Sequence, residues 1–166
     1  MEQASLGLTN SAREQTAKVL NSLLADEFVL LVKTWNCHWN IRGNAFHSQH
    51  VLLDEQYHAL VEVVDDIAER VRALGGQPLG SMHAIHEHTR LKEMPFHKPL
   101  PKAQEMVSAL VQDHETIVRE LRLHHDSVDQ RQHDVGTISL MEDLILKHEK
   151  MAWFLRAHLD DEEGQS

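Results

Sequence analysis

Five potential metal ligands stand at informative intervals within residues 38–70 of this 166-residue chain. They are two histidines and three carboxylates: His38, His50, Asp54, Asp65 and Glu69. Mixed imidazole and carboxylate ligands suit ferrous iron better than structural zinc, which proteins hold mainly with Cys and His. These residue types therefore point to the binding of ferrous iron.

Four of the five ligands are expected to lie on one helix. The chain runs from Phe46 to Leu74 without Gly or Pro, and Gly75 and Gly76 then provide a helix C-terminus. At about 100° per residue, the four ligands fall within one arc of about 100° that borders the apolar stripe of the helix. That stripe consists of Leu53, Tyr57, Leu60, Val64, Ile67 and Val71.

One copy of this helix cannot place all four ligands around one metal. Asp54 and Asp65 are about 16 Å apart along the axis, whereas metal–ligand bonds are about 2–2.5 Å long. However, Asp54 and Asp65 are equidistant from one point on the helix, and so are His50 and Glu69. Two copies crossing antiparallel at that point would pair each residue with its counterpart in the other copy. The spacing therefore predicts a two-fold dimer with two identical sites.

The alternative is that these residues only form a solvated helix face, as acidic residues usually do. The pair His50 and Asp54, or the pair Asp65 and Glu69, favours that alternative when taken alone. Together with His38, at the end of the preceding segment, the pairs favour a metal site. Three carboxylates beside a core stripe would repel one another unless protons or a cation neutralised them.

The motif HWNIRG, followed by Phe46, His50, Asp54 and the run DIAER, resembles the signature of the Dps family, the twelve-subunit mini-ferritins. The resemblance extends from KTWNCHWN to KMAWFLRAHL, nearly the whole chain. It implies a ferroxidase site, both catalytic and metal-binding, made of His38, His50 and Asp54 from one subunit and Asp65 and Glu69 from another. It also implies that hydrogen peroxide or oxygen oxidises ferrous iron there, that a homododecamer stores the ferric mineral, and that the protein protects against oxidative stress.

Two features depart from the family pattern. Members often line an iron channel with an Asp two residues after a Thr at the start of the last helix, but here Ser139 follows Thr137. Asp134, Glu142 and Asp143 are the candidates to supply negative potential instead. DNA-condensing members commonly use a Lys-rich tail, whereas the first seventeen residues here contain one Arg and no Lys. Weak or absent DNA binding is expected, and a DNA-binding protective shell with incidental iron chemistry is the alternative function.

Composition and charge narrow the class of protein further. A chain with 42% hydrophobic and 25% charged residues is typical of one globular domain, and its net charge of −10 opposes binding to nucleic acid or anionic membranes. No secretory signal is visible, and the longest aliphatic run, Phe28 to Val32, is too short to cross a bilayer. A cytoplasmic protein is expected, with association to the nucleoid left open. Cys37 is interpreted as a small buried hydrophobe.

The helical pattern of the chain predicts an all-α, ferritin-like four-helix bundle. A bundle domain over 9–160 is expected between a short tail at 1–8 and an acidic tail at 161–166. A polar loop is expected over 126–136, and a short extra helix is expected in the long connection between the second and third helices. The first helix is expected over 9–39 and begins at the cap cluster Thr9–Ser11. The others are expected over 46–74, over 81–89, over about 25 residues that start at Lys102, and over 137–159.

Other histidines and tryptophans have competing interpretations. His114 and His148 lie on apolar faces and are predicted to be core histidines with hydrogen-bond partners. The segment from His83 to His88 is a weaker candidate for a second metal site. A different ferritin-like oxidase would carry Glu-x-x-His pairs on two helices of one bundle. His83 and His86 in the connection have that spacing, but a His stands where the Glu would be. Trp39 and Trp153 either pack or donate electrons to oxidising intermediates.

Overall fold

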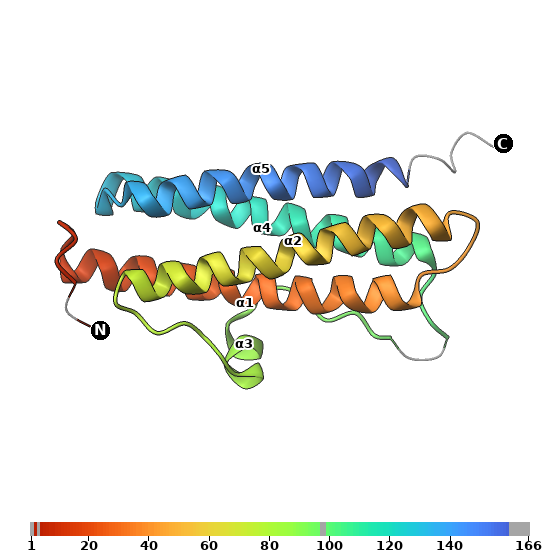
Figure 1. Cartoon of the computed structure of the whole chain (residues 1–166), viewed down its shortest axis with the longest axis horizontal. Helices are drawn as coiled ribbons and strands as arrows, with labels where there is room; N and C mark the ends of the chain where they lie inside the picture. The colour runs from red at the N-terminus through yellow and green to blue at the C-terminus, as the bar shows by residue number, and fades with distance from the viewer. Residues whose placement is uncertain (1, 3, 97–98, 160–166) are drawn as a thin grey trace.

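Two antiparallel pairs of long helices form the protein (Figure 1). The computed structural model describes residues 2, 4–96 and 99–159, with only the backbone described at 129–132. Its helices are α1 (Asn10–Asn40), α2 (Phe46–Ala73), α3 (Met82–His88), α4 (Ala103–Gln132) and α5 (Val135–Ala157). α1 packs along α2 and against α4, while α4 packs along α5. The predicted all-α bundle is confirmed, with α3 as the short helix between its second and third long helices.

Leucine side chains at helical spacing fill the core between the two pairs. Each fully buried Leu contributes about 1.5–3 kcal/mol relative to an exposed one. The helices are amphipathic, and within the described ranges none is long and apolar enough to span a membrane. The fully buried leucines include Leu20, Leu23, Leu24, Leu30, Leu53, Leu60, Leu74, Leu110 and Leu121.

The start of α1 and the end of α2 are joined by capping contacts. Thr9, in the predicted cap cluster, accepts a hydrogen bond from the backbone N–H of Ala12 at 3.1 Å. The buried Arg13 guanidinium donates to the carbonyl oxygen of Leu74 at 2.8 Å. Gly75 follows with a φ of 82°, and a Cβ there would lie 2.7 Å from the carbonyl oxygen of Glu2. Glycine is therefore required at this helix end.

The prediction of a polar loop over residues 126–136 is wrong. α4 continues to Gln132 and α5 begins at Val135, so the turn consists of two residues. Polar residues that face solvent do not end a helix unless a strong breaker is present. Here His133 adopts a left-handed φ of 53°, and Asp134 caps α5 by accepting from Thr137 N at 3.1 Å. The C-terminal tail predicted at 161–166 lies outside the described residues.

Buried ion pairs fasten the helices and the long connection together. Asp26 on α1 is fully buried and accepts from the backbone N–H of Arg90 at 2.6 Å and from its Nε at 2.8 Å. Arg90 also pairs with Glu120 on α4. A second buried pair joins α1 to α4, with Lys33 Nζ 2.5 Å from Asp113 Oδ2. Burial raises the pKa of Asp113, although Lys33 opposes that shift.

Cys37 confirms its predicted place in the core, with no exposed surface. Burial raises the pKa of its thiol to about 12. A thiol with so high a pKa carries almost no reactive thiolate at neutral pH, so Cys37 acts as a packing residue.

Candidate metal site

His38 and His50 face each other across the turn between α1 and α2. Their rings stack with centroids 3.8 Å apart. His38 Nδ1 lies 3.1 Å from the backbone oxygen of His50, and His50 Nδ1 lies 3.0 Å from the backbone oxygen of His38. A carbonyl oxygen can only accept, so both Nδ1 atoms must donate. Each Nε2 therefore keeps the lone pair with which a neutral imidazole binds metal.

Asp54, another predicted ligand, lies one helical turn after His50 and beside the ring of His38. Its Oδ1 is 3.9 Å from His38 Nε2, and its side chain is 46% exposed. The Tyr57 hydroxyl donates to the same oxygen at 2.9 Å, and this hydrogen bond raises the pKa of Tyr57. The carboxylate is thus held beside Nε2 of His38 and remains partly exposed to solvent.

Asp65 and Glu69 lie farther along α2, and both are exposed. They follow Asp54 by eleven and fifteen residues, which correspond to about 16 and 22 Å along the axis. Across residues 2, 4–96 and 99–159, no three His, Cys, Asp or Glu side chains converge into a metal site. One chain thus places His50 and Asp54 each beside His38. It does not bring Asp65 and Glu69 to them.

Tyr57 and Trp35 lie near the predicted ligands, although the sequence placed Tyr57 only in the apolar stripe of its helix. The Tyr57 ring meets His38 edge-on at 5.2 Å and lies 5.9 Å from Trp35. Trp35 in turn stacks on the exposed Trp39 at 6.4 Å. The spacing of Tyr57 three residues after Asp54 was the available signal, because such residues share a helix face.

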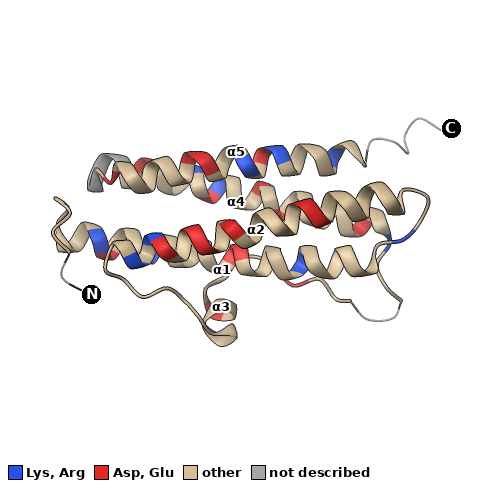
Figure 2. Ribbon diagram, in the orientation of Figure 1, with Lys and Arg blue, Asp and Glu red and all other residues tan. Residues whose placement is uncertain are grey.

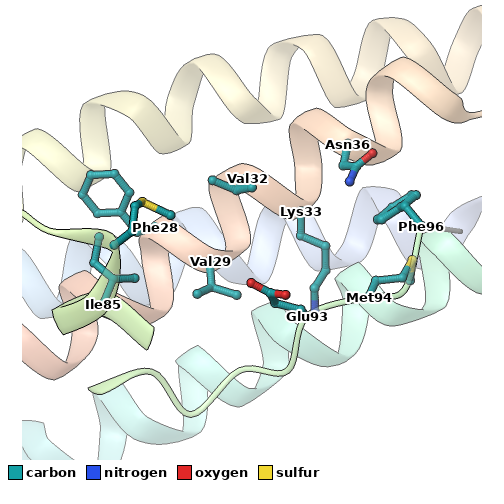
Figure 3. Close-up of a pocket in the computed structure, with 10 residues that line it drawn as sticks. Phe28, Val29, Val32, Lys33, Asn36, Ile85, Glu93, Met94 and Phe96 are labelled. Atoms are coloured by element: carbon teal, nitrogen blue, oxygen red, sulfur yellow. The ribbon is translucent and has the colours of Figure 1, made fainter. Parts of the chain in front are cut away.

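Two apolar hollows lie on the helices α1, α2 and α3. A cavity of about 180 Å³ opens between α1, α3 and the chain near residue 94, where Phe28, Val32, Ile85 and Phe96 surround it (Figure 3). Phe28 also borders a second hollow along α2, which contains Val61 and Asp65. The predicted ligand Asp65 therefore borders an exposed apolar surface. Further large hydrophobic side chains exposed on these helices are Trp39, Phe46, Val51 and Met82.

The remaining predicted residues have different surroundings. His114 and His148 are fully buried with their Nδ1 atoms 2.9 Å apart, which confirms them as core histidines. On α3, His83 contacts Glu87 at 3.5 Å, and the described part of the chain supplies no third ligand beside them. The prediction that Asp134 supplies negative surface potential near Ser139 is wrong, because Asp134 is buried and paired with Arg70 at 2.5 Å.

Comparisons with known proteins give a consistent picture. A family model described as a ferritin-like domain matches residues 17–164. An uncharacterized low temperature-induced protein of Nostoc sp. (strain PCC 7120) is 42% identical over 160 residues, which cover 96% of this chain and 88% of that protein.

Solved structures show the same likeness. DpsC from Streptomyces coelicolor aligns with a TM-score of 0.91 and 31% identity, covering 95% of this chain and 91% of that one. A Dps protein from Vibrio cholerae O1, described as a member of a broad superfamily of ferritin-like diiron-carboxylate proteins, aligns with a TM-score of 0.86. It is 30% identical, and the alignment covers 96% of this chain and 98% of that one.

Proposed function

Because the chain belongs to the Dps family of ferritin-like proteins, we propose that it is a ferroxidase that oxidises ferrous iron and stores the ferric product, limiting oxidative damage. The observation that carries this proposal is the reciprocal hydrogen bonding of His38 and His50. It leaves a lone pair on Nε2 of each ring, and Nε2 of His38 lies 3.9 Å from the carboxylate of Asp54.

The complete site, in this proposal, lies between two copies of the chain. His38, His50 and Asp54 come from one copy, and Asp65 and Glu69 from the other. The symmetric spacing of the ligands on α2 supports this pairing, and so does the apolar surface beside Asp65. Asp65, Glu69 and His38 hold one ferrous ion, while His50 and Asp54 serve the second ion and the bridge.

The charge of this ligand set favours oxidation. Three carboxylates stabilise a trivalent ion more than a divalent one, because the attraction grows with the charge of the ion. Hydrogen peroxide takes one electron from each of two ferrous ions and leaves two ferric ions and two hydroxides, so no hydroxyl radical is released. Oxygen is the alternative oxidant.

We propose that two-fold dimers assemble further into a dodecamer that encloses the mineral. Acidic and basic residues are interspersed along the helices (Figure 2), and the whole chain has a net charge of −10. Such a surface disfavours phosphate backbones. Protection is therefore expected to come from iron removal, with DNA binding weak or absent.

Anaerobic ferrous titration followed by peroxide, with the mass of the intact assembly measured in parallel, tests this function. We expect two ferrous ions per site, half a peroxide consumed per iron, and a particle of about 229 kDa, twelve times the 19.1 kDa chain. A monomer with full oxidation activity would contradict the shared site.

Tyr57→Phe is expected to slow ferrous oxidation and weaken ferrous binding by about 10-fold or more. The variant keeps the ring against His38 but removes the hydroxyl that orients Asp54, and losses of this size are usual when a group that orients a metal ligand is removed. Thr116→Val, which removes a hydroxyl from α4, is the control. Anaerobic titration and initial rates measure the effect, and unchanged binding in Tyr57→Phe would show that the hydroxyl does not orient the ligand.

A further inference from the structure

Three ionisable side chains from three helices meet in the core of the bundle. They are Glu27 on α1, His114 on α4 and His148 on α5, with exposed fractions of 1%, 0% and 0%. The Nδ1 atoms of His114 and His148 are 2.9 Å apart, and His148 Nε2 lies 2.9 Å from Glu27 Oε1. The second of these is an ion-pair contact whose alignment falls short of a hydrogen bond. We call these three residues the core string.

The core string is isolated from other charges. Glu27 Oε2 and His114 Nε2 have no hydrogen-bond partner. On the elements packed around it, the buried ions Asp26 and Lys33 are paired with Arg90 and Asp113, and the buried Arg13 donates to Leu74 O at the start of α1. α2 buries no ionisable side chain. Because a buried carboxylate is costly without a compensating charge, that charge must come from within the string itself.

A proton fits the core string better than a metal ion. His148 directs its two ring nitrogens at two different partners, so Glu27, His148 and His114 form a row and do not surround one point. The described residues accordingly contain no group of three ligands able to hold a metal. Two ring nitrogens 2.9 Å apart have room for one hydrogen between them. If both rings were imidazolium ions, two N–H groups would face each other.

We propose that the core string is an acid-sensitive lock, which holds α1, α4 and α5 together while His114 and His148 share at most one charge. When acid protonates both rings, the contact between them breaks and the helices loosen. The device is separate from the candidate metal site, since none of its residues contacts a predicted ligand.

The expected direction follows from the burial of the string. Burial, together with the neighbouring His148, lowers the pKa of His114 well below its usual 6.5. In the unfolded chain His114 becomes protonated near pH 6.5, whereas in the folded chain it becomes protonated only at a lower pH. Stability is thus fully present above about pH 6.5 and falls below it, by about tenfold in the folding equilibrium per pH unit. For a chain of this size, that equals about 3–5 °C in the melting midpoint per unit.

Thermal unfolding of the full chain between pH 7.5 and 5.0 tests the lock. The melting midpoint of the wild type is expected to fall by about 5 °C or more as the pH is lowered from 6.5 to 5.0. The triple variant Glu27→Leu, His114→Leu and His148→Leu, which replaces the whole string by apolar side chains, is expected to lose less than half as much. His83→Gln with His86→Gln, on the exposed α3, is the control and should behave as wild type. An equal loss in the triple variant and the wild type would overturn the proposal.

Hydrogen exchange of the wild type gives a second reading that does not depend on whether the triple variant folds. Exchange rates are first corrected for the intrinsic effect of pH. When the pH is lowered from 7 to 5, the opening constant of α4 and α5 near His114 and His148 should increase at least about tenfold more than the opening constant of α2. A uniform change along the helices would overturn the lock. Zinc that stabilises the dialysed wild type but not the triple variant would show a cation site instead, and would overturn it as well.

Discussion

Asp65→Asn combined with Glu69→Gln is expected to lower the initial rate of ferrous oxidation by at least about 100-fold while leaving the fold intact. Groups that merely orient metal ligands are worth 10–100-fold, and these two carboxylates are proposed to be ligands themselves. Both side chains are exposed, so their replacement removes no core contact. Glu55→Gln with Glu62→Gln, two exposed carboxylates on the same helix, is the matched control. Stopped-flow absorbance of the ferric product measures the rate.

Mixing two inactive variants separates a shared site from a site within one chain. The two variants are Asp54→Asn and the double variant Asp65→Asn with Glu69→Gln. Asp54→Asn is expected to be inactive because it, too, removes a proposed metal ligand. Random assembly of equal amounts places one intact site in half of the dimers, so about a quarter of wild-type activity should return. No recovery in particles shown by mass to contain both chains would contradict the shared site.

Asp113→Ala is expected to lower the free energy of unfolding by about 3–5 kcal/mol. The substitution leaves the Lys33 ammonium in the core without its partner, and an uncompensated buried charge is strongly destabilising. Urea unfolding at pH 7 measures the loss. Lys33→Met with Asp113→Leu, which removes both charges, is the control and should stay within about 1–2 kcal/mol of wild type. A cost below about 1 kcal/mol for Asp113→Ala would show that water reaches Lys33.

The helices were predictable because their apolar residues recur at helical spacing and strong stop signals, such as Gly75, follow them. The short turn at His133 and Asp134 was not, since polar composition alone does not distinguish a solvated helix from a loop. Asp134 was misjudged for a related reason. Its burial depends on Arg70, a residue 64 positions away that only the packing of α2 against α5 brings close.

The candidate site was predictable only in part. His38, His50 and Asp54 come together as their positions at the ends of two successive helices suggest. The pairing with Asp65 and Glu69 stays a prediction, because it depends on a second copy of the chain. The histidines of the core string were recognised as buried, but Glu27 was not connected with them. A contact between three separate helices leaves no local pattern in the sequence.

The mutual hydrogen bonds of His38 and His50 have a consequence for affinity. Each ring is fixed by the backbone of the other residue, so both lose their rotational freedom when the chain folds. A ferrous ion that binds there therefore meets two imidazole rings whose orientations are already fixed, and little of its binding free energy is consumed in ordering them. The cost of assembling this half of the site is borne by folding, before any iron is present.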